Sequence, residues 1–311
     1  WTSQDLATYR QWIKRKMSRK RTLNQPLVGQ LNNLNPGLAN VSQFLSSTSP
    51  HIMGVLNITP DSFSDGGCFN SVDEAVSQAI KMVEAGASII DIGGESTRPG
   101  ATPVAVKEEL NRVIPVIRAI RSRSNVLISI DTSKPEVMQQ AVDVGANIIN
   151  DIYALRQTGA IEMAALLQVP VCLMHMQDKP ETMQLNPKYA KVVDEVKAFF
   201  DERIKACEEA GINRDKIILD PGFGFGKTLA HNLSLLKHLE SFKEYHCPLL
   251  AGLSRKSMFG LLLDKPVEER ALASVTSALL AVMNGASIVR VHDVAETAEV
   301  LKIYNAIQNA D

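Results

Sequence analysis

Two loop-like segments carry polar residues that could bind an anionic substrate. Residues 53–67 read MGVLNITPDSFSDGG, in which an apolar run delivers Asn57 and a turn-rich stretch with a single aromatic residue, Phe63, follows. Residues 91–100 read DIGGESTRPG, and their serine, threonine and arginine side chains can donate hydrogen bonds to an anion. We expect both segments to face a substrate.

A third segment, residues 220–228, reads DPGFGFGKT and ends like a phosphate-binding P-loop. The P-loop interpretation fails because the first glycine of that motif is replaced by Pro221. The dinucleotide-binding pattern also fails, since its glycine spacing is different. The better interpretation is a strand that ends at Asp220, followed by glycines that let the backbone approach a flat ligand. Phe225 would then present its ring to that ligand.

The fourth segment has two parts, GLSRKS at residues 252–257 and RVHD at residues 290–293. Its cations and hydrogen-bond donors are Arg255, Lys256, Arg290 and His292, with Ser254 beside them. Such groups suit a phosphate or a diphosphate, because guanidinium, ammonium and imidazole groups all donate to phosphoryl oxygens.

Regular alternation of apolar runs and helical stretches positions these segments. Strands are expected at residues 52–56, 88–92, 126–130, 147–149, 171–174, 216–219, 248–251 and 287–291. Helices are expected at about 72–85, 107–121, 135–144, 159–168, 188–210, 229–240, 266–284 and 293–308. Eight strands, each followed by a helix, predict an α/β protein with a closed (β/α)8 TIM barrel.

A polar residue lies at the end of each expected strand. The eight are Asn57, Asp91, Asp131, Asn150, His175, Asp220, Ser254 and His292. Any one of them could instead be a helix N-cap or a turn residue. The whole set favours a functional mouth, because TIM barrels build their active sites at the carboxyl ends of the strands and often bind phosphate after strands seven and eight.

Composition narrows the classes of function. The net charge of −1 argues against general nucleic-acid binding. The four cysteines form no C-x-x-C pair and are expected to be free thiols in a reducing compartment. The sequence contains no run of about 18 apolar residues and no signal-like stretch near its start, so we expect no membrane span and a cytoplasmic enzyme.

The first part of the chain differs from the rest. We predict two parts, an N-terminal extension at residues 1–49 and a barrel domain at residues 50–311. The extension contains a strongly basic run at residues 14–21. A solvated helix face, a nucleic-acid or targeting patch, and an arm packed on an acidic surface all remain open for this run.

The ordered motifs resemble those of one family. MGVLNITPDSFSDGG and DIGGESTRPGA resemble the two signature segments of the dihydropteroate synthases, a family of pterin-binding TIM barrels. IDTSKPEV, IINDI, LDPGFGFGKT, GLSRKS and RVHDV resemble its other segments in the same order, over about residues 50–311. The resemblance implies a transferase of folate biosynthesis. It would condense 6-hydroxymethyl-7,8-dihydropterin diphosphate with p-aminobenzoate, giving 7,8-dihydropteroate and pyrophosphate by a dissociative substitution.

The resemblance also implies roles for individual residues. Those implied to bind the pterin are Asp131, Asn150, Ile152, Met174, Asp220 and Lys256. Those implied to bind the diphosphate are Asn57, Thr97, Arg98, Arg290 and His292, with Asn57 contacting Mg2+. The implied p-aminobenzoate pocket contains Phe63, Thr97, Pro99, Phe225, Ser254 and Arg255, with Lys256 next to it. The implied catalytic residues are Asp131, Lys256, Arg290 and His292.

The partners implied by the resemblance are small-molecule substrates, sulfonamides as competitors of p-aminobenzoate, and a second copy of the chain. The apolar helix expected at residues 266–284 could provide the dimer face, although it must also pack against its own barrel. Two other functions remain open. A methyltetrahydrofolate–corrinoid methyltransferase would need no diphosphate site, and a non-catalytic pterin-binding barrel would be expected to lose the loop residues, which are present here.

Overall fold

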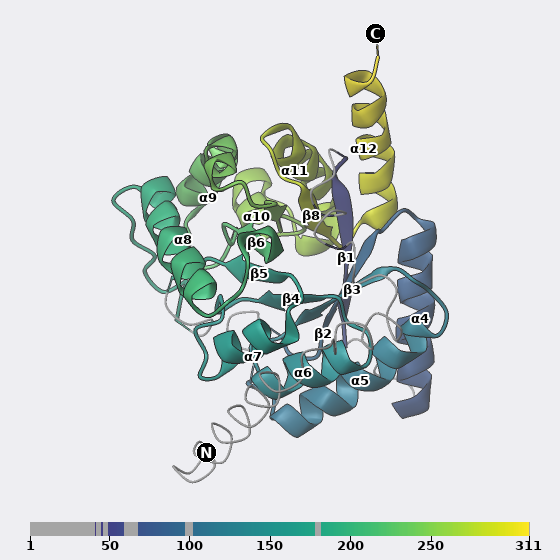
Figure 1. The fold of residues 1–311 in the computed structure, drawn as a ribbon. Coiled ribbons are helices and arrows are strands. Elements are labelled where there is room, and N and C mark those ends of the chain that lie inside the picture. Colours follow the sequence, from purple (N-terminus) through teal and green to yellow (C-terminus); the bar gives the residue numbers. More distant parts are fainter. Residues whose placement is uncertain are drawn as a thin grey trace. The chain divides into compact units, whose positions relative to one another are not determined.

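The computed structural model describes residues 49–58, 68–96, 102–177 and 182–310, together with Val41 and Leu45. All of them belong to the unit Asn40–Asp311. Eight parallel strands are neighbours in the order β6-β5-β4-β3-β2-β1-β8-β7 (Figure 1). A further parallel bridge between Leu219 and Leu249 joins the two ends of this sheet. The predicted (β/α)8 barrel is therefore confirmed.

Each strand overlaps the range expected for it, because short runs rich in Ile and Val suit buried parallel strands. The strands are β1 (His51–Asn57), β2 (Ile89–Gly93), β3 (Leu127–Asp131), β4 (Ile148–Asp151), β5 (Val171–Met174), β6 (Ile217–Asp220), β7 (Leu250–Ala251) and β8 (Ile288–Val291). The residues that end β3, β4 and β6 are aspartates, so each of these strands delivers a carboxylate to the same end of the barrel.

Helices surround the strands (Figure 1). They are α4 (Cys68–Glu84), α5 (Val106–Arg121), α6 (Pro135–Asp143), α7 (Ala160–Leu167), α8 (Val192–Glu209), α9 (Leu229–Lys237), α10 (Ser257–Leu263), α11 (Ala271–Met283) and α12 (Val294–Gln308). Where a helix packs closely on a strand, only small residues fit at the contact. For example, a Cβ added to Gly54 of β1 would lie 2.7 Å from Sδ of Met82 in α4.

The segment between β7 and β8 differs from the prediction of one helix. It contains α10, a short 3-10 turn at Val267–Glu269, and α11. Asp264 adopts a left-handed conformation with φ of 54°, and Pro266 follows two residues later. A residue before proline is disfavoured in the helical region, so the helix ends here and a second one begins after the turn.

The N-terminal end of the barrel interior, which we call the floor, is apolar. Each strand contributes one side chain to it: Met53, Ile89, Leu127, Ile148, Cys172, Ile218, Leu250 and Ile288. Val41 and Leu45, both helical, pack against this ring and are each 2% exposed. Two residues of the segment assigned by sequence to the extension thus belong to the core of the barrel.

Two residues beyond the floor, five of the strands place polar or charged residues at the interior positions. Side chains of alternate strand residues point to the same face, so these positions also face inward. They include Asp91, Ser129, Asn150, Asp220 and Arg290, and we call this end of the interior the mouth. The change from apolar to charged side chains over one inward-facing layer marks where a site can lie.

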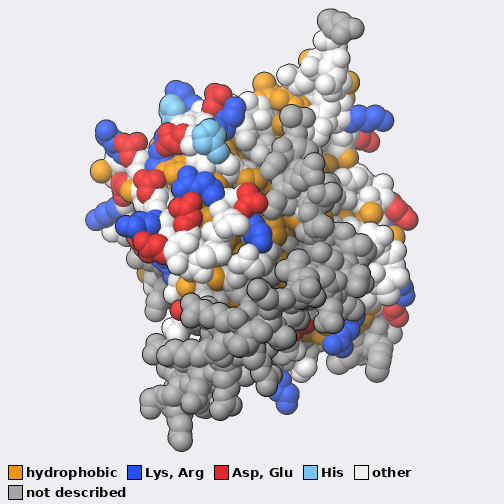
Figure 2. Space-filling model, in the orientation of Figure 1, with side chains coloured by type: hydrophobic (Ala, Val, Ile, Leu, Met, Phe, Trp, Pro, Cys, Tyr) orange, Lys and Arg blue, Asp and Glu red, His pale blue; other side chains and the backbone are white. Residues whose placement is uncertain are grey.

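Two surface expectations can be compared with the described residues. None of their helices has the length and apolarity needed to cross a membrane. On the face shown in Figure 2, their Lys and Arg side chains are interspersed with Asp and Glu side chains. This mixture fits the near-zero net charge of the chain.

Candidate active site

Arg290 joins two carboxylates at the centre of the mouth. Its Nε donates to Oδ2 of Asp91 at 2.6 Å, and its Nη2 donates to Oδ2 of Asp131 at 2.9 Å. Asn150 also donates from Nδ2 to Oδ2 of Asp91, at 3.2 Å. These residues come from β8, β2, β3 and β4, so four strands converge on one polar cluster.

One carboxylate of this cluster has a pKa close to neutral pH. Burial, followed by the charge of Asp91, raises the pKa of Asp131 to about 7, although Arg290 opposes the shift. Burial alone would lower the pKa of Arg290, but Asp91 and Asp131 raise it, so the guanidinium stays charged. One cation thus faces two carboxylates, and Oδ1 of buried Asp91 has no hydrogen-bond partner among the described residues. A ligand that offers N–H donors would relieve this imbalance.

Across the mouth, Asp220 and Lys256 form a second charged group. Asp220 is buried at the end of β6, and its Oδ1 accepts the N–H of Gly222 at 2.8 Å. Burial raises its pKa, although Gly222 and Lys256 oppose the shift. Burial, followed by the charge of Arg290, lowers the pKa of Lys256 to about 8. The Lys256 Nζ lies 4.3 Å from the centre of the Phe225 ring, in a cation–π contact.

Beside these charges lies an apolar cluster that can bind the faces of a flat ring. It is formed by Ile152, Met174, Met176 and Met183, with Tyr153 and Phe225 packed against it. Ile152 and Met174 are 9% and 4% exposed, so little of either side chain is open to solvent. Methionine side chains adapt well to aromatic surfaces.

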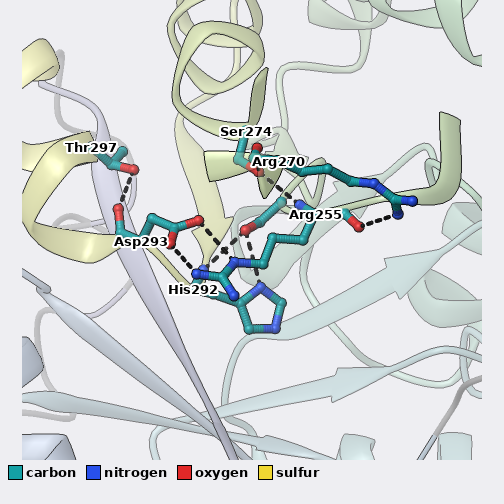
Figure 3. Close-up of polar contacts among 7 residues, drawn as sticks. Arg255, Arg270, Ser274, His292, Asp293 and Thr297 are labelled. Atoms are coloured by element: carbon teal, nitrogen blue, oxygen red, sulfur yellow. Dashed lines mark hydrogen bonds and ion pairs between the residues drawn. The ribbon is translucent and has the colours of Figure 1, made fainter. Parts of the chain in front are cut away.

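Hydrogen bonds and an ion pair join the loop after β7 to the loop after β8 (Figure 3). The Oγ of Ser254 lies 3.0 Å from Nδ1 of His292 and accepts the His292 backbone N–H at 3.2 Å. Arg255 donates to Asp293 through Nε at 3.2 Å and Nη2 at 2.5 Å. Burial, with the charge of Arg290, lowers the pKa of His292 to about 4, so its imidazole is neutral at pH 7.

Helix α11 also holds the Ser254–Lys256 stretch. Ser274 accepts the backbone N–H of Arg255 at 2.8 Å, and Arg270 donates to the Arg255 carbonyl at 3.3 Å (Figure 3). Arg255 has a φ of 56°, an uncommon conformation for a residue with a side chain. Its ion pair and these two contacts together stabilise that conformation, which orients the flanking Ser254 and Lys256.

Known proteins match both the sequence and the fold. The family model for pterin binding enzymes matches residues 53–292. The chain is 56% identical over 266 residues to the dihydropteroate synthase of Escherichia coli K12, covering 86% of this chain and 94% of that protein. It is 54% identical over 266 residues to the enzyme of Haemophilus influenzae, covering 86% and 97%. The chain belongs to the dihydropteroate synthase family.

Solved structures of dihydropteroate synthases support the same assignment. The Yersinia pestis enzyme in a sulfonamide drug complex has a TM-score of 0.81 and 51% identity, covering 85% of this chain and 96% of that one. The Xanthomonas albilineans enzyme in complex with 7,8-dihydropteroate has a TM-score of 0.78 and 47% identity, covering 86% and 96%. The chain is therefore a transferase of the dihydropteroate synthase family, and the corrinoid methyltransferase interpretation is not supported.

The structure brings together most of the residues predicted for a dihydropteroate synthase site. Those at the mouth are Asp131, Asn150, Ile152, Met174, Asp220, Phe225, Ser254, Arg255, Lys256, Arg290 and His292. Asn57 ends β1 at the same edge; a Cβ on Gly93 would lie 3.5 Å from its Oδ1 and 3.8 Å from Oδ2 of Asp131. Phe63, Thr97, Arg98 and Pro99 lie outside the described residues.

Four residues that make polar contacts in or beside the mouth had no role predicted from the sequence. Asp91 was recognised as a polar strand-end residue, and the two-residue spacing from Ile89 on the floor could have placed it in the mouth. The spacing of residues along the chain does not reveal the partners of the other three. Lys227 contacts His175, and Asp293 pairs with Arg255.

The described residues contain no group of three or more His, Cys, Asp and Glu side chains that could hold a metal ion. The amide oxygen of Asn57 is the hard oxygen donor that Mg2+ prefers, and its place near Asp131 fits a single protein contact to such an ion.

Proposed function

We propose that this enzyme condenses 6-hydroxymethyl-7,8-dihydropterin diphosphate with p-aminobenzoate to form 7,8-dihydropteroate and pyrophosphate. One observation carries the proposal: Arg290 lies between the buried carboxylates of Asp91 and Asp131, with the cationic Lys256 nearby. Carboxylates that need N–H donors, next to cations that need an anion, match a substrate with an aminopyrimidinone ring and a diphosphate.

The pterin ring would bind deepest in the mouth. Its amino and ring N–H groups would donate to Asp220 and Asp131, and Asn150 would pair with the remaining edge through its amide. Ile152 and Met174 would contact the ring faces, since both belong to the apolar cluster beside these carboxylates. This arrangement would satisfy buried acceptors that otherwise have few partners.

The diphosphate would lie at the outer part of the mouth. Arg290 and His292 would donate to its oxygens, with Thr97 and Arg98 predicted to add further donors. We propose Mg2+ as the ion that neutralises the leaving diphosphate, with Asn57 as its protein contact. Neutral His292 can donate a hydrogen bond from Nε2 in the tautomer whose Nδ1 accepts the hydroxyl of Ser254.

The chemistry is a dissociative substitution at the exocyclic methylene carbon. The C–O bond to the diphosphate breaks first, and the bonding electrons leave with the diphosphate. The resulting cation is delocalised over the pterin, and the carboxylate of Asp131 stabilises it electrostatically. The amine of p-aminobenzoate then forms the C–N bond and loses a proton to solvent. Arg290 stabilises the charge that develops on the leaving group.

The p-aminobenzoate would bind at the rim, where Phe225, Ser254, Arg255 and Lys256 lie together. Phe63, Thr97 and Pro99 are predicted to complete this pocket. Two relatives support it, namely the Yersinia pestis enzyme in its sulfonamide complex and a Xanthomonas albilineans enzyme with 4-aminobenzoic acid. We therefore expect sulfonamides to compete with p-aminobenzoate here.

We further propose a cytoplasmic homodimer, with residues 50–311 as the catalytic barrel and residues 1–49 as an extension whose role, apart from adding Val41 and Leu45 to the barrel core, is unassigned. Large apolar side chains on α11 and α12 support the dimer, because Leu272, Met283, Ile303 and Ile307 are all more than half exposed. Three free, buried cysteines support a reducing compartment.

The direct test incubates the purified enzyme with the pterin diphosphate and Mg2+, with and without p-aminobenzoate. We expect pyrophosphate and dihydropteroate in equal amounts, both dependent on p-aminobenzoate. If the pterin diphosphate binds and no condensation follows, the chain is a non-catalytic barrel. If the pterin diphosphate does not bind, the account of the anion site is wrong.

A further inference from the structure

Lys227, the lysine of the segment that resembles a P-loop, is buried in the protein. The residue is 4% exposed. Its Nζ donates to the carbonyls of Gly222 and Phe225, each at 2.9 Å, and lies 2.9 Å from Nδ1 of His175. Three acceptors at this distance match the three N–H bonds of a protonated amine. The amino group is therefore saturated by the protein itself and is not available to a phosphate.

The charges around this lysine fix the direction of its contact with His175. Burial, followed by the charge of Lys227, lowers the pKa of His175 to about 2, so the imidazole is neutral. Burial lowers the pKa of Lys227 to about 7, and the charge of Asp220 opposes the shift. When Lys227 is protonated its ammonium can only donate, so Nδ1 of His175 accepts the hydrogen bond.

Three glycines allow the chain to fold around the lysine. Gly222, Gly224 and Gly226 have φ values of 69°, 80° and 61°, which residues with a Cβ rarely adopt. A Cβ on Gly222 would lie 1.9 Å from the carbonyl oxygen of His175, and one on Gly224 would lie 3.0 Å from Cδ of Lys256. The alternating glycines thus let the β6–α9 loop turn its carbonyls toward Lys227 while its outer side touches Lys256.

Phe225 links this anchored loop to the substrate pocket. Its carbonyl is held by Lys227, its ring lies against Lys256, and it packs on the apolar cluster that contains Met174. The backbone contact and the ring contact belong to one residue, so a change in the first must move the second.

We propose that Lys227 is a positioning residue, whose amino group fixes the β6–α9 loop so that the ring of Phe225 stays against Lys256 and forms one wall of the p-aminobenzoate pocket. The identity of the ligand rests on the proposed function. The anchoring of the loop rests only on the contacts of Lys227 with its three acceptors.

The test compares Lys227→Met with the control Lys216→Met. Lys216 lies just before β6, at the opposite end of that strand, and also uses its Nζ to hold a loop, through the carbonyl of Gln168 at 2.7 Å. We expect Lys227→Met to raise the KM for p-aminobenzoate by about tenfold and the KM for the pterin diphosphate by clearly less. Lys216→Met should leave both KM values within about twofold of the wild type.

Equal changes in both KM values for Lys227→Met, or no change in either, would overturn the proposal. If this variant does not fold, His175→Phe replaces it, because that change removes one acceptor and keeps an aromatic ring against Phe199, whose centre lies 4.9 Å away. The ratio of the two KM values should shift in the same direction and by less. An unchanged ratio would also overturn the proposal.

A measurement without substrates separates this inference from the proposed function. NMR spectra of enzyme labelled with 15N-lysine, recorded at about pH 6 where Lys227 is protonated, should show a slowly exchanging side-chain ammonium resonance that is missing in Lys227→Met and retained in Lys216→Met. Absence of this resonance in the wild type would contradict the anchoring. Failure of the wild type to make dihydropteroate, with the resonance present, would instead contradict the proposed function alone.

Discussion

The floor and the mouth of this barrel are built on the same eight strands but have different functions. The floor takes one apolar side chain from each strand and is covered by Val41 and Leu45. The mouth begins one inward-facing layer higher and buries Asp91, Asp131 and Asp220 with Arg290. Apolar burial stabilises the fold, whereas a buried polar group without a partner costs about 1–3 kcal/mol. The comparison teaches that stability and binding are separated along the barrel axis, so that changes at one end should affect one property more than the other.

The largest expected effect comes from Arg290→Met in the mouth. The change leaves Asp91 and Asp131 without their shared cation, and removes the principal donor to the diphosphate. We expect the affinity for the pterin diphosphate, measured by calorimetry, to fall by at least about 100-fold. Because removing one partner of a buried ion pair also destabilises by about 3–5 kcal/mol, thermal unfolding must be measured in parallel. Unchanged affinity would remove Arg290 from the anion site.

The matching change in the floor is Ile148→Ala. Truncating a fully buried isoleucine creates a cavity, and we expect it to lower the free energy of unfolding by about 2–5 kcal/mol. Below its unfolding temperature, the variant should keep kcat/KM within about threefold of the wild type. Denaturant unfolding and steady-state kinetics check both values. A loss of kcat/KM as large as that of Arg290→Met would contradict the separation of floor and mouth.

The dependence on pH should follow Asp131. If its carboxylate stabilises the pterin cation, kcat/KM should fall about tenfold for each pH unit below the pKa of about 7. The stability of the fold should depend on pH in the opposite direction to kcat/KM. The folded-state pKa lies above the ordinary value of 3.8, so the stabilisation is fully present below about pH 4 and is lost as the pH rises through 7. In Asp131→Asn, both dependences should flatten between pH 5 and 8, in rate profiles and in melting curves.

The smallest effect is expected where the loops after β7 and β8 meet. Asp293→Asn keeps the shape of the side chain but weakens its pair with Arg255, which is partly exposed. We expect a loss of about 0.5–1 kcal/mol in stability and a rise of about threefold in the KM for p-aminobenzoate. The exposed pair Lys191 and Asp194 provides the control, since Asp194→Asn should change neither quantity measurably.

The sequence predicted the floor and the mouth to different extents. Short apolar, β-branched runs such as Ile89-Ile90 identify the strands, and the two-residue spacing links Ile89 on the floor to Asp91 in the mouth. Motif resemblance supplied most residues of the mouth. Helix α10 was not predicted, because its seven residues are too few for a helical period to show, and the helix expected at residues 266–284 begins only at Ala271.

The partners of long side chains could not be predicted from the sequence. Arg255 was predicted at the p-aminobenzoate pocket, but its ion pair with Asp293 was not predicted. No partner was predicted for Lys227, whose amino group lies among backbone carbonyls of its own loop. A flexible side chain with four or more rotatable bonds takes its direction from tertiary partners, which periodicity and spacing do not encode.

The most direct test of the account is the kcat/KM of Asp131→Asn at pH 8, where the wild-type carboxylate is ionised, together with its melting temperature. The substitution keeps the size of the side chain and removes only the charge that is proposed to stabilise the cation. We predict a fall in kcat/KM of at least about 100-fold, with a melting temperature within a few degrees of the wild type. A value of kcat/KM within a few-fold of the wild type, or a loss of activity that only follows a loss of stability, would contradict the central role of the mouth.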